Sequence, residues 1–163
     1  MAWALYYLLA PVNRAVSALA ALFQLVYAGI ALVGLLNLAT IYHMLTIPEY
    51  AATLGTRLLH ADVNLLLHTF RTYYSLGLIL FGIHLILIGA LIVRARYMPW
   101  WLGVALVIDG AGWIVTELQP YLFPNVNVDW LFYTFFGELL LMLWLLIMGW
   151  RIKQPQPALA AAR

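Results

Sequence analysis

The stretch Tyr73–Val93 reads YYSLGLILFGIHLILIGALIV and decides the fold. It contains no Asp, Glu, Lys or Arg, and as an α-helix it would be about 30 Å long, which matches the hydrocarbon core of a bilayer. A helix satisfies its own backbone hydrogen bonds inside lipid, and this uniformly apolar run lacks the alternation of a barrel strand. The stretch therefore predicts a transmembrane helix.

The composition of the whole chain points the same way. Of its 163 residues, 66% are apolar and 9% are charged, with a mean hydropathy of +0.97. Ordinary soluble domains carry roughly 25% charged residues. A soluble enzyme, a nucleic-acid-binding protein and a disordered chain are therefore excluded as classes. The chain has no cysteine, so it has no disulfide framework, thiolate metal site or thiol nucleophile.

Three further apolar stretches are long enough to cross a bilayer. The predicted spans are residues 16–42, 73–93, 100–118 and 130–150. We expect an all-α, polytopic membrane helical bundle with four transmembrane helices and a short N-terminal apolar segment, which together form one domain over residues 1–153. Residues 56–70 contain several leucines between charged residues, and they predict either an outer-side interfacial helix or an extension of the second span. Residues 154–163, rich in Pro and Ala, predict a disordered tail.

Basic residues indicate how the chain is oriented. Two arginines, Arg57 and Arg71, fall on one predicted side of the membrane. The other side carries Arg14, Arg94, Arg96, Arg151, Lys153 and Arg163. The positive-inside rule therefore places both termini in the cytoplasm, with the chain in the plasma membrane, which is the inner membrane of a bacterium.

Each predicted span contains one polar group at a similar depth. Counted from the basic side at 1.5 Å per residue, these groups lie about 13 to 20 Å into the membrane. They are Gln24, His84, Asp109 and Glu138. Polar groups in spans usually face the bundle interior, so we expect one hydrogen-bonded cluster. It is either a polar staple that holds the helices in register or a proton-handling or ligand-binding site.

Glycines predict how the spans pack. Gly77 and His84 are seven residues apart and share one helix face, whereas Gly82 and Gly89 share the opposite face. Small residues let helices approach closely, so the second span is expected to contact neighbours on two sides. In the third span, Gly112 shares a stripe with Asp109.

A second polar layer is expected near the outer boundary, at His43, His68, Arg71 and Glu117. Arg71 and Glu117 are a plausible ion pair, because each charge needs compensation near lipid. The layer is either a set of unrelated solvated side chains or an externally open site.

No cofactor is predicted. None of the four histidines has the spacing of a zinc site, so no metal site is expected. His84 offers one axial ligand for a haem, which leaves a haem- or pigment-binding membrane subunit as a further alternative.

Several motifs in the second half of the chain, together with Pro11-Val12-Asn13-Arg14, are similar to those of a known family. They are Phe81-Gly82-Ile83-His84, Arg94-Ala95-Arg96-Tyr97-Met98-Pro99, Leu102-Gly103-Val104, Gly110-Ala111-Gly112-Trp113 and Gly137-Glu138. The chain resembles an uncharacterised bacterial integral membrane family, domain of unknown function 4386.

The resemblance implies a multi-helix membrane protein, usually with two more spans before the Pro11–Arg14 turn. Residues 1–10 match the end of a span, so the chain looks like a member that lacks its first two helices. His84 and Glu138 match the family pattern. Asp109 departs from it, and an acidic position expected near Thr116 is shifted to Glu117. The family brings no established activity.

Three functions are consistent with these features. The first is a non-enzymatic accessory or partner subunit of a membrane complex, or a homo-oligomer. The second is a small transporter, or a proton-coupled or lipid-binding protein, that uses the mid-membrane polar cluster. The third is the haem- or pigment-binding subunit. Expected partners are membrane lipids and other membrane subunits, and no nucleic acid.

Overall fold

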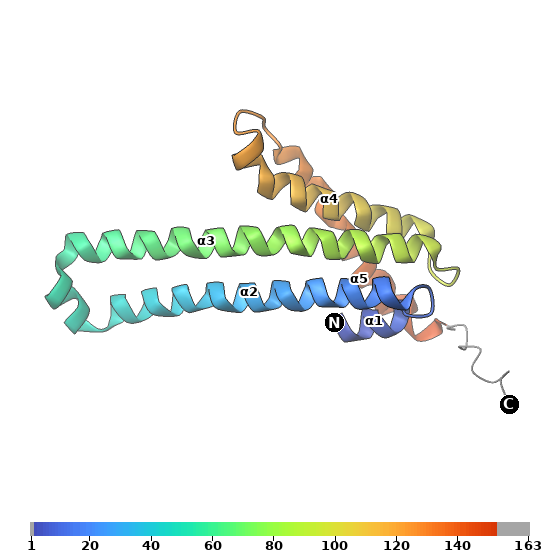
Figure 1. Cartoon of the computed structure of the whole chain (residues 1–163), viewed down its shortest axis with the longest axis horizontal. Coiled ribbons are helices and arrows are strands. Elements are labelled where there is room, and N and C mark those ends of the chain that lie inside the picture. The colour runs from blue at the N-terminus through green and yellow to red at the C-terminus, as the bar shows by residue number, and fades with distance from the viewer. Residues whose placement is uncertain (1, 153–163) are drawn as a thin grey trace.

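The computed structural model describes residues 2–152, and all secondary-structure elements in this part of the chain are helices, without a β-strand. Figure 1 shows the arrangement. The elements are α1 (Ala2–Leu9), α2 (Arg14–Thr46), α3 (Pro48–Arg94), α4 (Trp100–Leu122), η1 (Asp129–Phe135), α5 (Phe136–Met148) and η2 (Gly149–Arg151). Lys153, Arg163 and the tail predicted over residues 154–163 lie outside the described residues.

The predicted fold class is confirmed. Four helical segments are long and apolar enough to cross a membrane: Arg14–Thr46, Pro48–Arg94, Trp100–Leu122 and Tyr133–Arg151. The first of them begins at a defined cap, because the Asn13 side chain accepts a hydrogen bond of 3.1 Å from the backbone N–H of Val16.

The second span is much longer than the predicted 73–93. Residues 56–70 continue into it as one helix, so they form the predicted extension and not a separate interfacial helix. The helix is broken at Gly55, whose φ of 70° and ψ of 158° are a conformation that residues with a Cβ rarely adopt. The short stretch of α3 before the kink connects the long part of the helix to the end of α2 (Figure 1).

The third and fourth spans also differ in detail from the prediction. The third span is predicted to end at residue 118, but α4 continues through Pro120 to Leu122, and the N–H of Phe123 bonds to the carbonyl of Gln119. Proline lacks a backbone N–H and restricts the conformation of the residue before it. Helices therefore often end near a proline, but they can continue past it. The fourth span begins as a 3₁₀-helix, and only Phe136–Met148 is α-helical.

The helices pack in a row in the order α2 on α3, α3 on α4, and α4 on η1 and α5, and α5 then runs behind α3 toward α1 (Figure 1). The two helices in the middle are the more covered: in its most apolar stretch, 50% of α3 and 33% of α4 is buried, against 11% of α2 and of the last span. At 1.5 Å per residue, α2 is about 50 Å long and α4 about 35 Å. The α2–α3 hairpin therefore extends well beyond α4.

We call the two ends of the molecule the basic end and the hairpin end. The basic end holds the start of α2, the α3–α4 turn and the end of α5, and the hairpin end holds the α2–α3 connection (Figure 1). Four arginines belong to the segments at the basic end: Arg14, Arg94, Arg96 and Arg151.

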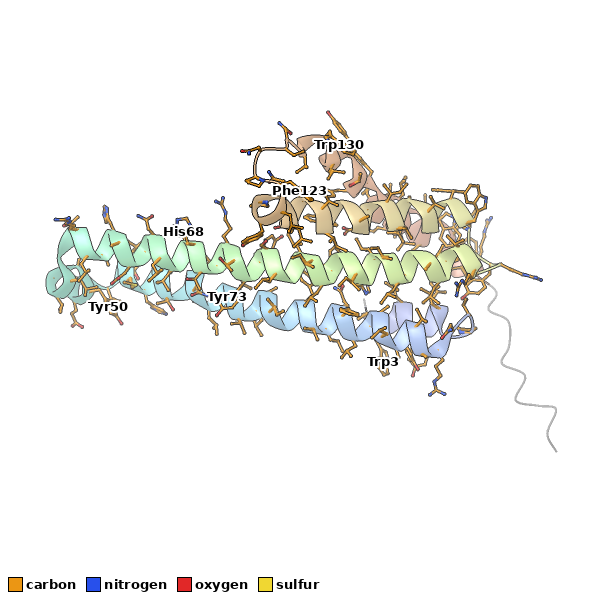
Figure 2. The ribbon with its side chains drawn as sticks, turned by 45° about the horizontal axis from the view of Figure 1, so that its top comes forward. Trp3, Tyr50, His68, Tyr73, Phe123 and Trp130 are labelled. Carbon is orange, nitrogen blue, oxygen red and sulfur yellow. The ribbon has the colours of Figure 1, made fainter. Side chains whose placement is uncertain are left out.

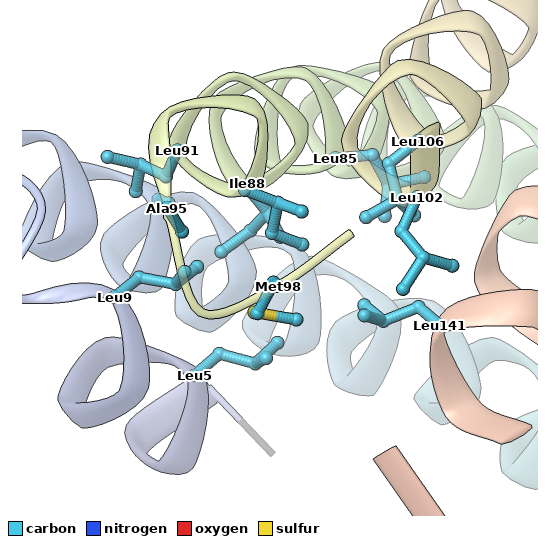
Figure 3. Close-up of a cluster of buried hydrophobic side chains, with 12 residues drawn as sticks. Leu5, Leu9, Leu85, Ile88, Leu91, Ala95, Met98, Leu102, Leu106 and Leu141 are labelled. Carbon is cyan, nitrogen blue, oxygen red and sulfur yellow. The ribbon is translucent and has the colours of Figure 1, made fainter. Parts of the chain in front are cut away.

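The core lies at the basic end and takes side chains from every α-helix. Figure 3 shows this cluster, to which α1 contributes Leu5 and Leu9, α3 contributes Ile88 and Leu91, α4 contributes Leu102 and Leu106, and α5 contributes Leu141. The fully buried Ile92, Leu102 and Leu106 are among its largest members.

Polar contacts hold α1 against this core. The hydroxyl of Ser17 is fully buried and donates to the carbonyl of Tyr6 over 2.9 Å, and the hydroxyl of Tyr97 donates to the carbonyl of Leu8. The short N-terminal segment is thus tied to both α2 and the α3–α4 turn. The residue pattern did not predict these two bonds, because their acceptors are backbone carbonyls.

Candidate functional site: a polar layer inside a glycine-packed helix row

Two reciprocal glycine contacts bring α3 and α4 together. A Cβ built on Gly82 would lie 2.6 Å from the carbonyl oxygen of Gly110, and one on Gly89 would lie 2.6 Å from that of Gly103. In each helix the two glycines are seven residues apart, so they share a face, and the antiparallel helices match them pair by pair. The pairing of Gly82 with Gly110 and of Gly89 with Gly103 was not predicted, although the equal spacing is visible in the sequence.

The other two predicted packing glycines serve different interfaces. Gly77 faces α2, where a Cβ would lie 3.1 Å from the ring of Tyr27. Gly112 faces η1, where a Cβ would overlap the hydroxyl of Thr134. Close approach through small residues therefore occurs between all three neighbouring pairs in the row.

His84 ties α3 to α2. Its side chain is 4% exposed, and Nδ1 lies 2.7 Å from the carbonyl oxygen of Ala20. A carbonyl only accepts, so Nδ1 carries the hydrogen and donates. In the neutral ring, Nε2 is then left as an acceptor. The ring of Phe81 stacks beside it with a centroid distance of 6.0 Å.

Asp109 ties α4 to α5. It is fully buried, and its Oδ2 accepts a 2.9 Å hydrogen bond from the backbone N–H of Glu138. This N–H lies in the first turn of α5, where helix donors lack intrahelical partners. Gly137 permits the approach, because a Cβ there would lie 2.8 Å from the same carboxylate oxygen. Asp109 thus caps a neighbouring helix.

Glu138 makes a second hydrogen bond between α4 and α5. Its Oε1 accepts a hydrogen bond of 3.0 Å from the indole nitrogen of Trp113 on α4. The indole is itself held by Phe135, with ring centroids 4.0 Å apart and planes inclined by 9°. The α4–α5 interface is therefore fixed by two hydrogen bonds and one aromatic stack.

A cavity of about 60 Å³ lies at the centre of this polar layer. Gln24, His84 and Glu138 line it together with apolar side chains of α1, α3, α4 and α5. The buried oxygens Oε1 of Gln24 and Oδ1 of Asp109 have no hydrogen-bond partner. A cavity of this size has room for a few water molecules, and water is the usual partner of such atoms.

The expectation of a single hydrogen-bonded cluster is corrected by this geometry. No side chain among Gln24, His84, Asp109 and Glu138 bonds directly to another of the four in the described structure. His84 and Asp109 bond to backbone groups of the adjacent helix, and Glu138 bonds to an indole. The four polar groups share a level, and His84, Asp109 and Glu138 each connect one neighbouring pair of helices.

The second polar layer divides into two places at the hairpin end. His43 lines a pocket at the α2–α3 connection together with Glu49. His68, Arg71 and Glu117 line a different groove, between α3 and α4. The predicted ion pair is absent from the described residues, because no nitrogen of Arg71 lies within 4.0 Å of a carboxylate oxygen of Glu117. The two helices diverge here, which separates the charges.

The fold and this polar layer together define a multi-pass helical membrane protein whose spans are packed by glycines and tied by buried polar groups. Its sequence matches the family described as domain of unknown function (DUF4386) over residues 1–149. The chain belongs to this family, as the resemblance of its motifs predicts.

A relative is found in Archaeoglobus fulgidus, where it is described as an uncharacterized protein. It is 36% identical over 154 residues, which cover 94% of this chain and 78% of the relative. No solved structure matches the chain. These comparisons establish the family, whose function is unknown.

Proposed function

We propose that this protein is a non-enzymatic subunit of a membrane assembly. The observation that carries the proposal is the use of the polar groups: His84, Asp109 and Glu138 each make a hydrogen bond that joins neighbouring helices. Such interhelical bonds contribute about 0.6 to 2 kcal/mol each, which suits a structural tie. The side chains that a catalyst would need are thus already engaged in packing.

The proposed contact surface is the outer face of α2, and the proposed occupant is a second copy of the chain. Support comes from the row arrangement, which leaves α2 with α1 and α3 as its helical neighbours. On that face a Cβ at Gly29 would meet nothing within 4 Å. A small residue with free space in an otherwise leucine-rich face allows close helix approach.

The test is the mass of the protein extracted with its lipids in copolymer discs. We expect a multiple of the 18.4 kDa chain. Gly29→Leu is expected to reduce the assembly to single chains without changing the free energy of unfolding of one chain. Gly149→Leu is the matched control, because a Cβ at Gly149 also meets nothing within the chain, and it should leave the assembly intact.

A stable single chain without any companion would contradict the proposal. If the discs contain this chain together with a different protein, the occupant of the α2 face is a partner subunit and not a second copy. Equal effects of the two leucine substitutions would remove α2 as the contact helix.

The orientation and the membrane are part of the proposal. With Arg14, Arg94, Arg96 and Arg151 at the basic end, the positive-inside rule supports placing both termini in the cytoplasm of the source cell. The membrane would then be a plasma membrane, the inner membrane in a bacterium.

A second candidate function rests on the cavity. The unpartnered oxygen of Gln24, which lines the cavity, favours a site that holds water or passes protons beside Glu138. Its volume of about 60 Å³ suits water better than a lipid, a pigment or a haem. The transporter and haem alternatives therefore receive less support than the structural one.

A further inference from the structure

A groove of about 520 Å³ opens between α3 and α4 at the hairpin end. It begins where α4 diverges from α3 beyond the Gly82–Gly110 contact (Figure 1). His68 lies on α3 beyond the end of α4, which Phe123 marks in Figure 2. We call this the hairpin-end groove. Its chemistry comes from His68, Arg71, Glu117, Ser75, Tyr74 and Tyr121.

Both signs of charge face this groove without neutralising each other. Arg71 and Glu117 line it, and no salt bridge within 4.0 Å joins them in the described structure. Arginine is suited to phosphate because its guanidinium offers several donors in a fixed fork. His68 adds a second nitrogen, and Glu117 offers a carboxylate to a cation. The groove can therefore bind an anion and a cation that are joined in one ligand.

The depth of the groove identifies where such a ligand resides. Measured along the helices, Arg71 lies about 34 Å from Arg94, and Glu117 lies about 25 Å from Trp100. The hydrocarbon core is about 30 Å thick, so these charges fall at the level of the lipid headgroups. The exposed rings of Tyr74 and Tyr121 agree with that level, because tyrosine is enriched at membrane interfaces.

We propose that the hairpin-end groove binds the headgroup of a zwitterionic phospholipid. Arg71 and His68 would hold the phosphate, and Glu117 would accept hydrogen bonds from the amine. A soluble amino-phosphoester shares this chemistry, but the depth favours the lipid. The site is independent of the assembly proposed above.

The experiment compares lipid binding by native mass spectrometry after exchange into discs of defined lipid. The probes are phosphatidylethanolamine, which has an amine, and phosphatidylglycerol, which has none. We expect phosphatidylethanolamine to bind more tightly by about tenfold. Arg71→Gln should weaken both lipids about tenfold, because a charge-assisted contact to the phosphate is lost. Glu117→Gln should remove the preference for the amine and leave phosphatidylglycerol binding unchanged or stronger.

Arg57→Gln is the matched control. Arg57 is an exposed arginine on the same helix, and it lines a separate pocket near Gly55. Its replacement should leave the affinity for both lipids unchanged. All three variants substitute side chains outside the core, and their thermal unfolding in detergent verifies that they fold.

Equal binding of the two lipids, or equal effects of Arg57→Gln and Arg71→Gln, would overturn the proposal. If Glu117→Gln still prefers phosphatidylethanolamine, Glu117 is not the group that binds the amine. Free phosphoethanolamine at millimolar concentration should not compete. Competition at micromolar concentration would overturn the lipid as the source of the ligand.

Discussion

Gly110→Leu is expected to lower the free energy of unfolding by about 3 kcal/mol, at the upper end of the range for overpacked sites. A Cβ at this position would overlap the carbonyl oxygen of Gly82 and lie 3.0 Å from both Ile86 Cγ1 and Leu85 Cβ. Because the nearest atom belongs to the backbone of α3, it cannot move aside as a side chain can. The helices must separate, and contacts along the whole α3–α4 interface weaken.

Unfolding in mixed micelles of detergent and SDS, followed by tryptophan fluorescence, measures this loss. Gly149→Leu is the control, since a Cβ there has open space, and its effect should stay within about 0.5 kcal/mol. If the two substitutions cost the same, the close α3–α4 contact does not exist in the membrane.

Asp109→Leu is expected to lower the free energy of unfolding by about 2 to 4 kcal/mol. The substitution leaves the N–H of Glu138 without its acceptor in a buried place, which costs about 1 to 3 kcal/mol. The branched side chain also crowds Gly137, where a Cβ would lie 2.8 Å from Asp109 Oδ2 and 3.0 Å from Asp109 Cβ. Asp109→Asn keeps an acceptor oxygen of the same size, so its cost should stay below about 1 kcal/mol.

The same denaturation experiment distinguishes the roles of Asp109. A large cost for leucine with a small cost for asparagine assigns Asp109 to capping α5. If asparagine destabilises as strongly as leucine, the carboxyl group does something that an amide cannot, and the proton-handling candidate gains support.

The positions of the spans could be predicted because each depends on a property of the local sequence. Tyr73–Val93 is apolar over the thickness of a bilayer, and this alone identifies a helix. Where that helix begins and ends also depends on contacts with neighbouring helices, which the local sequence pattern does not reveal. Residues 56–70 have a mixed pattern, and they become part of α3 because α2 lies beside them. Pro120 permits one more turn of α4, although proline is usually a sign that a helix ends.

The candidate site could be predicted in its residues but not in its bonds. Depth counting along each span placed Gln24, His84, Asp109 and Glu138 at one level, and the structure brings three of them to one cavity. Their hydrogen bonds go to the carbonyl of Ala20, the N–H of Glu138 and the indole of Trp113. Every residue has a carbonyl and nearly every residue an N–H, so a residue pattern cannot select which one is used.

In the row, α3 and α4 lie in the middle, with α2 packed on α3 and η1 packed on α4, and engineered disulfides in the native membrane test this order most directly. The chain has no cysteine, so introduced pairs report without background. A Cβ at Gly34 lies 3.6 Å from that of Tyr73, and one at Gly112 lies 3.2 Å from that of Thr134. Both separations are close to those of natural disulfides.

The account predicts that Gly34→Cys with Tyr73→Cys, and Gly112→Cys with Thr134→Cys, form intramolecular disulfides on mild oxidation. The exchanged pair, Gly34→Cys with Thr134→Cys, should stay reduced within one chain, because no Cα atoms of α2 and η1 lie within 8 Å of each other. Rapid disulfide formation in the exchanged pair, together with none in the first two, would contradict the row.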